Sequence, residues 1–202
     1  MSLERGGRTD KYGNEYENRY LAKLLLRIVS GDLSSIIVEP LGEGHDSVEF
    51  ISETPKGERY YYQCKASNFT KDNWSPSDLK KYNIFQRSKS ILEESKDNRY
   101  VFISPLSYGE LSELCKRART DLNGEELYHF QLTNKDIKSA FQACEKYYAL
   151  KASDSKELIK LHDLLSRTYY ETVLFDDEAL RQTRDLVSLY FSGIASLSLI
   201  HI

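Results

Sequence analysis

The sequence predicts an α/β fold, in which helices pack against a central sheet. Segments with the period of an amphipathic helix alternate with short runs of β-branched and aromatic residues, in the order αβββαβαβα. Apolar residues make up 40% of the chain, which is enough to bury a core. The 202 residues have the length of one domain. We therefore expect one domain over residues 1–193, with a core at about 12–150 and a helical extension at about 151–193.

The first predicted element is a helix over residues 14–29, with Gly31 as its stop signal. Its apolar side chains recur at helical spacing and form one stripe: Tyr20, Leu21, Leu24, Leu25 and Ile28. Glu17 heads this stripe, whereas Glu15 points nearly opposite. One acid of the helix should therefore face the core and the other should face water.

Three strands are predicted after this helix. Residues 35–39 (SIIVE) have the pattern of a short buried strand. Residues 46–52 (DSVEFIS) and 59–66 (RYYYQCKA) have the pattern of a β-hairpin around the turn TPKGE. Because side chains alternate along a strand, Gln63 and Lys65 should lie on the same face.

The rest of the chain alternates between helices and short strands. Periodicity and turn residues predict a helix at 76–94, a strand at 99–104, a helix at 108–119, a strand at 128–132, helices at 134–150 and 155–166, a strand or extended link at 170–175, and a helix at 177–191. Thr133 is the candidate N-cap of the helix at 134–150. The apolar, β-like residues 194–202 are either the start of an element that continues in a longer protein or a terminal edge strand.

Composition excludes several classes of protein. No apolar run approaches the roughly 20 residues that cross a bilayer, and the N-terminus lacks the apolar segment of a secretion signal. The cysteines are odd in number and form no CxxC pair, which argues against a disulfide framework and a cysteine-based zinc site. The net charge of −3 requires any polyanion to bind a local basic surface. We expect a cytoplasmic protein without membrane contact.

Four polar side chains should meet near the hairpin: Glu17, Asp46, Gln63 and Lys65. Oxygen atoms from a helix and two adjacent strands can hold one or two Mg²⁺ ions, which prefer hard oxygen ligands. Such a metal polarises a phosphate and activates a bound water. Lys65 would place a positive charge where negative charge develops on the phosphate. The pattern predicts a metal-dependent phosphodiesterase site.

The Gln63–Lys65 spacing is not specific by itself. The same [DEQ]xK pattern occurs at Asp78–Lys80 and Asp136–Lys138, but in predicted helices, where residues i and i+2 do not share a face. Glu39, at the end of the first strand, is either a site residue or a solvated strand end. His45 could shuttle protons near neutral pH, or could be an ordinary loop residue.

Three runs, GNEYENRYLAKLLL, HDSVEF and YYYQCKAS, resemble the PD-(D/E)xK nuclease superfamily in its Mrr-like variant, which carries QxK. Gly13 and Tyr16–Glu17 match the G-x-x-[F/Y]-E helix start of that family, Asp46 matches its strand aspartate, and Gln63 with Lys65 matches its QxK. The later pattern is similar to the double-stranded DNA endonuclease domain at the N-terminus of bacterial antiphage proteins. In those proteins the nuclease is fused to a cyclic-oligonucleotide sensor or to a STAND NTPase.

This resemblance implies a restriction-endonuclease-like core with a mixed central sheet flanked by helices, followed by C-terminal helices. It also implies Mg²⁺-dependent hydrolysis of double-stranded DNA, with Mn²⁺ as an alternative cofactor. Asp46, Gln63 and Glu17 would be metal ligands, and Lys65 would orient the attacking water. Self-association would activate the domain, and a C-terminal sensor or NTPase domain would follow in the parent protein.

The aspartate position has one alternative. Asp46 is followed by Ser47 instead of the usual aliphatic residue, which leaves Glu49 as a second candidate ligand. Glu49 would lie on the opposite face of a regular strand from Asp46, so Asp46 is favoured.

Basic residues outnumber acidic ones between Lys65 and Arg99, which suggests contact with a phosphate backbone. The candidate DNA-contact residues are Lys71, Trp74, Lys80 and Lys81. Two alternatives to a DNA endonuclease stay open. One is a nuclease-like module that binds nucleic acid or oligomerises without chemistry, and the other is a nuclease for RNA or branched DNA.

Overall fold

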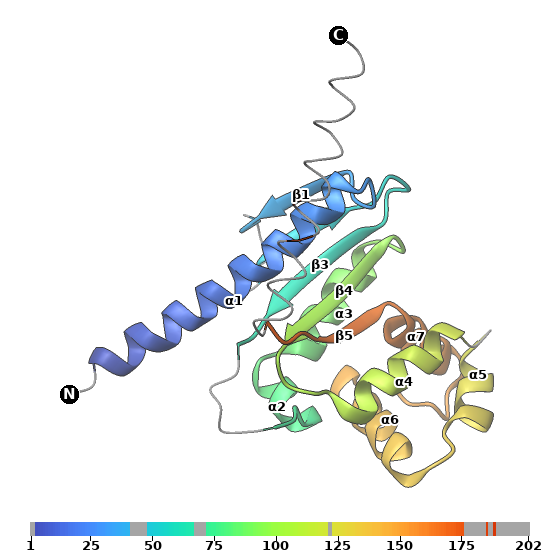
Figure 1. Cartoon of the computed structure of the whole chain (residues 1–202). Helices are drawn as coiled ribbons and strands as arrows, with labels where there is room; N and C mark the ends of the chain where they lie inside the picture. Colours follow the sequence, from blue (N-terminus) through green and yellow to red (C-terminus); the bar gives the residue numbers. More distant parts are fainter. Residues whose placement is uncertain are drawn as a thin grey trace.

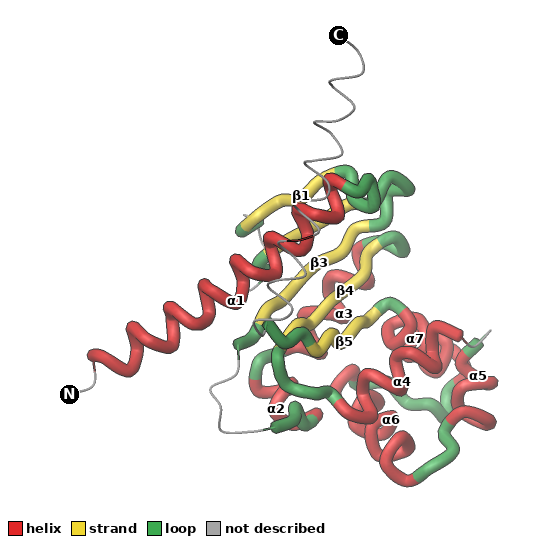
Figure 2. Tube along the Cα trace, in the orientation of Figure 1, coloured by secondary structure: helices red, strands yellow, loops and turns green. Residues whose placement is uncertain are grey.

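The computed structural model describes residues 3–40, 48–66, 72–120 and 123–175 with Asp185 and Ser188, and the described side chains begin at Asn14. The elements labelled in Figure 1 and their neighbours are α1 (Leu3–Val29), β1 (Ser35–Val38), β2 (Phe50–Glu53), β3 (Arg59–Cys64), α2 (Pro76–Lys81), α3 (Ile84–Glu94), β4 (Asn98–Ser104), α4 (Gly109–Thr120), α5 (Gly124–Glu126), η1 (Leu127–Gln131), α6 (Lys135–Tyr148), α7 (Ser155–Ser166) and β5 (Thr168–Thr172). The predicted α/β class, with a mixed central sheet flanked by helices, is confirmed (Figure 2).

The described strands form one five-stranded sheet in the order β1-β2-β3-β4-β5. The first three strands are antiparallel, and β3, β4 and β5 are parallel. The predicted hairpin is β2–β3, with Phe50 opposite Tyr62 and a turn in which Gly57 has a φ of 87°. β5 lies within the segment predicted as a helical extension and forms one edge of the sheet.

α1 lies across one face of the sheet (Figure 1). Tyr16, Tyr20 and Leu24 follow one another at helical spacing, are buried, and share a core cluster with Tyr62. The helix begins at Leu3, earlier than predicted. Leu25 is predicted in the buried stripe but is 52% exposed. The buried side chains among the described residues of α1 are Tyr16, Tyr20 and Leu24. This face therefore depends on aromatic packing between α1 and β3.

Helices that follow β3 cover the opposite face of the sheet. Tyr61, Tyr100 and Phe102 pack there against buried side chains of these helices in one cluster. Val101 and Ile103 of the same strand belong to the cluster under α1. β4 is thus buried on both faces, as its apolar sequence and parallel neighbours require.

The helix predicted over 76–94 is two helices. Ser75 caps α2 in a capping box with Asp78, and Pro76 occupies its first turn. Asn83 has a φ of 57°, in the left-handed region, and its backbone separates α2 from α3. Asparagine tolerates this conformation better than most residues. The helical periodicity of the apolar residues continues across Asn83, so the sequence pattern predicts one helix.

Two predictions in the later part of the chain are wrong. The segment predicted as a strand at 128–132 lies in the π-helix η1, and three consecutive exposed residues there show none of the alternating burial of a strand. The N-cap of α6 is Asn134 and not Thr133. The Asn134 side chain accepts a hydrogen bond of 2.8 Å from the Ile137 N–H.

β1 was predicted as a buried strand and is instead an exposed edge strand, whose Ile37 and Val38 are about half exposed. Among the described strands it pairs with β2 alone.

The predicted helix at 155–166 is confirmed as α7. Residues 177–191, apart from Asp185 and Ser188, and residues 194–202 lie outside the described residues. Within the described chain, no helix combines the length and apolar character needed to cross a membrane.

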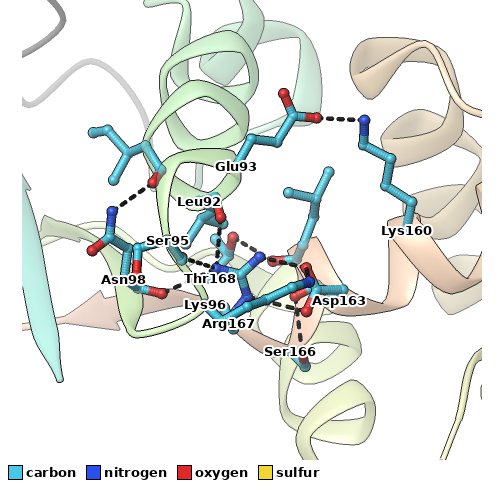
Figure 3. Close-up of polar contacts among 12 residues, drawn as sticks. Leu92, Glu93, Ser95, Lys96, Asn98, Lys160, Asp163, Ser166, Arg167 and Thr168 are labelled. Atoms are coloured by element: carbon cyan, nitrogen blue, oxygen red, sulfur yellow. Dashed lines mark hydrogen bonds and ion pairs between the residues drawn. The ribbon is translucent and has the colours of Figure 1, made fainter.

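Arg167, between α7 and β5, ties three elements together (Figure 3). Its buried guanidinium donates to the carbonyl oxygens of Leu92, Ser95 and Asn98 at 2.7–3.3 Å and to the carboxylate of Asp163. Carbonyl groups at the end of α3 lack helical partners and attract positive charge. Burial alone would raise the pKa of Asp163, but the hydrogen bonds it accepts, first of all from Arg167, outweigh this and lower it.

Candidate active site

The predicted glutamine–lysine pair lies at the carboxyl end of β3. Lys65 follows the strand directly, and its side chain is 32% exposed. Gln63 is completely buried, and its Oε1 accepts a hydrogen bond from the Tyr100 hydroxyl. Gln63 Nε2 has no hydrogen-bond partner in the described part of the chain. Lys65 can therefore meet a ligand from solvent, whereas Gln63 belongs to the core.

Among the described residues, the acid that pairs with Lys65 is Glu49, just before β2. Glu49 Oε1 lies 4.0 Å from Lys65 Nζ, and Glu49 Oε2 accepts a hydrogen bond of 2.7 Å from the Cys64 backbone N–H. Burial raises the pKa of Glu49 to about 7, although the Cys64 N–H and Lys65 lower it in part. A carboxyl group that titrates near neutral pH thus lies beside the lysine.

A β-bulge brings Glu49 to this place. Phe50 is paired with Tyr62, yet the Glu49 N–H also donates to the Tyr62 carbonyl at 2.9 Å. Two consecutive residues therefore face one residue of β3, the pattern that re-aims side chains at a bulge. Val48 and Phe50, which would share a face of a regular strand, consequently join opposite core clusters. The preference for Asp46 over Glu49 assumes an uninterrupted strand, and the bulge shows that this assumption is wrong.

Glu17 interacts electrostatically with both Lys65 and Glu49, and Glu39 interacts with Glu17. Glu17 on α1 is partly buried and Glu15 is exposed, as predicted. Burial raises the pKa of Glu17, Lys65 lowers it, and Glu39 raises it. The Glu39 N–H donates to the Glu49 carbonyl at 2.9 Å, and the Glu39 φ of 48° is a left-handed conformation of the kind that clusters at functional sites. Three acids and one lysine gather where α1 and the first three strands meet.

The other predicted site residues are either outside the described residues or in other parts of the described fold. Three of them fall outside the described residues: Asp46, His45 and Lys71. Trp74 is partly buried, and its ring packs edge-on against Phe102 with centroids 5.6 Å apart. The Trp74 indole thus forms part of the core wall. Lys80 and Lys81 are exposed on α2, the first helix after β3.

The carboxylates of Glu17 and Glu49 have the hard oxygen donors that Mg²⁺ prefers. Within residues 14–40, 48–66, 72–120 and 123–175, no three His, Cys, Asp or Glu side chains are placed to hold a metal. The Glu39 N–H donates to the Glu49 carbonyl, which joins the end of β1 to this cluster. The donor chemistry of Glu17 and Glu49 fits a hard divalent cation.

A separate hollow of about 430 Å³ lies between α3 and α7. It is lined by the Arg167 cluster, in which Lys96 pairs with Asp163 and Lys160 pairs with Glu93 (Figure 3). It lies where β4 and β5 begin, whereas Lys65 follows the carboxyl end of the parallel β3.

Comparison of the chain with protein-family models, with curated proteins and with solved structures found no match. Any activity must therefore be inferred from the groups at the carboxyl end of β3. An ammonium group beside carboxylates can stabilise negative charge on a phosphate while the carboxylates hold a cation.

Proposed function

We propose that this chain is a Mg²⁺-dependent endonuclease of the PD-(D/E)xK type that hydrolyses double-stranded DNA. The observation that carries the proposal is the 4.0 Å approach of Lys65 to Glu49 at the carboxyl end of β3, with Glu17 interacting with both. A helix acid, an acid before the second strand and a lysine after the third occur in the order of the family motif. In this proposal the domain is the cytoplasmic effector of a bacterial antiphage protein, and self-association under a C-terminal sensor or NTPase domain activates it.

Each side chain has a separate role in the proposed reaction. Bound Mg²⁺ would supply a Lewis acid that polarises the scissile phosphate and lowers the pKa of water. Glu17, Glu49 and Asp46 would hold it, and Mn²⁺ could replace it. Lys65 orients the attacking water and stabilises the charge that develops on phosphate oxygens. The water oxygen bonds to phosphorus as the bond to the 3′ oxygen breaks, which leaves a 5′ phosphate.

The test is a cleavage assay with supercoiled plasmid, linear duplex and structured RNA in Mg²⁺, Mn²⁺ or EDTA. The chain is assayed alone and fused to a dimeric coiled coil, because activation by self-association requires a high local concentration. We expect the fusion to cut duplex DNA in Mg²⁺ and not in EDTA. Lys65→Ala should lower the rate by about 10²–10³-fold, the usual loss for one preorganised group. Lys56→Ala, at the exposed turn of the hairpin, is the matched control.

Three results would contradict the proposal. Cleavage that persists in EDTA, or that Lys65→Ala leaves unchanged, would place the activity outside this cluster. Degradation of RNA with intact duplex would favour the RNA-nuclease alternative.

One observation favours a catalytically inactive binding or oligomerisation module. Gln63 is completely buried, and the oxygen that the family motif would offer to a metal accepts a hydrogen bond from Tyr100. No cleavage of any substrate by the clustered fusion, together with duplex binding or self-association of the chain, would support this second function.

A further inference from the structure

Two lysines from distant parts of the sequence lie over one tyrosine ring. Lys80 on α2 and Lys146 on α6 place their Nζ atoms 5.6 Å and 5.8 Å from the centroid of Tyr147. α2 and α6 are in contact, and both lie on the side of the sheet opposite α1 (Figure 1). Both ammonium groups therefore lie beside the same ring, one from each helix.

Within the described part of the chain, no acid pairs with either ammonium group. The described residues offer no ion pair to Lys80 or Lys146, and both side chains are exposed. The nearby acids have other partners: Asp78 lies 4.0 Å from Lys81, and Glu145 accepts a hydrogen bond from the Ala152 backbone N–H. An anion that approaches this ring is therefore attracted by both ammonium groups.

The tyrosine is held in a fixed place and offers a third polar group. Its ring packs against buried Phe85, with centroids 5.1 Å apart and planes inclined by 36°. This contact anchors the ring to the core while the lysines approach it from outside. The Tyr147 hydroxyl makes no hydrogen bond to a described residue. Two ammonium groups and one hydroxyl are thus available to phosphate oxygens.

The site lies at the same edge of the sheet as the candidate active site. The Trp74 N–H, just before α2, donates to the Ser107 carbonyl, which follows the carboxyl end of β4. β3 runs parallel to β4, so Lys65 emerges at this edge too. A nucleic acid bound at this edge could therefore contact α2 and α6 together.

We infer that Lys80, Lys146 and Tyr147 form a binding site for backbone phosphates of duplex DNA, outside the catalytic cluster. The choice of duplex rests on the proposed function, whereas the phosphate chemistry rests on the side chains alone. Lysine contacts of this kind carry no base specificity, and their strength falls steeply with salt.

The test measures binding of a fluorescent duplex by anisotropy in EDTA, where no cleavage occurs, over a series of salt concentrations. The variant Lys80→Gln/Lys146→Gln should weaken binding by about 10-fold at low salt and reduce the slope of log K against log[salt] by about 1 to 2. Tyr147→Phe keeps the ring and removes only the hydroxyl contact, so it should weaken binding less. Lys56→Gln/Lys156→Gln removes the same charge from two exposed lysines elsewhere and should retain the wild-type slope.

The outcomes separate this inference from the proposed catalysis. Duplex binding is measured in EDTA and cleavage is measured in Mg²⁺, so a loss of one can be told from a loss of the other. Normal duplex binding without cleavage in Mg²⁺ would refute the nuclease proposal and leave the phosphate site intact. Equal affinity and slope for wild type and the Lys80/Lys146 variant, an equal loss in the control, or binding of structured RNA but not duplex would overturn the inference.

Discussion

Replacing Glu49 with glutamine should stabilise the fold at alkaline pH. The Glu49 side chain is 16% exposed, and burial raises its pKa from 4.5 to about 7. Because the folded chain then holds this proton more tightly than the unfolded chain, the stabilising contribution is complete below pH 4.5 and is lost as pH rises through about 7. A tenfold difference in acidity is worth about 1.4 kcal/mol, so ionising Glu49 should cost the fold about 3 kcal/mol.

The assay is urea unfolding followed by circular dichroism in EDTA, at about pH 5 and about pH 8. Between these values, wild type should lose about 2–3 kcal/mol relative to Glu49→Gln. The glutamine oxygen can still accept the Cys64 N–H bond, so the local backbone should be retained. Glu53→Gln, in the same strand but paired with exposed Arg59, is the control. Parallel pH curves for wild type and Glu49→Gln would refute the reasoning.

Two further changes test the fold by urea unfolding. Arg167→Met leaves three carbonyl groups without their donor and should lower the free energy of unfolding by about 3 kcal/mol. Arg59→Met removes an exposed ion pair and should cost less than about 1 kcal/mol, and similar losses for the two variants would contradict the stabilising role of Arg167. Ala149→Gly should raise the free energy of unfolding by about 0.5–1 kcal/mol, because Ala149 ends α6 with a φ of 53°. Ala143→Gly, inside the same helix, should lower it by about 1 kcal/mol, and a loss at both positions would contradict the assignment of the helix end.

Local patterns predicted most elements of the fold. α7 has its predicted bounds because two local signals agree: Asp154 caps its first turn, and buried leucines recur at helical spacing. The hairpin was predictable because TPKGE supplies a turn between two strands of strong β propensity. Signals of this kind depend on residues that are close together in the chain, so distant contacts change the resulting local structure little.

The errors arise where distant contacts decide the local structure. The burial of Gln63 depends on the hydroxyl of Tyr100, which β4 supplies. No pattern around Gln63 reports that contact. η1 likewise lies between two asparagine caps, Asn123 and Asn134, whose spacing and packing determine its shape more than the β propensity of its aromatic residues.

The bulge at Glu49 places an acid beside Lys65 that an uninterrupted strand would not place there. In the QxK pattern, the residue two positions before the lysine offers the oxygen. Here the Gln63 oxygen accepts a hydrogen bond from the core, while the Glu49 carboxylate lies 4.0 Å from Lys65. A one-residue irregularity in β2 thus keeps an acid beside the lysine although the acid comes from a different strand. Substitution of Glu49 should therefore affect cleavage more than a conservative change of Gln63, because the local charge belongs to Glu49.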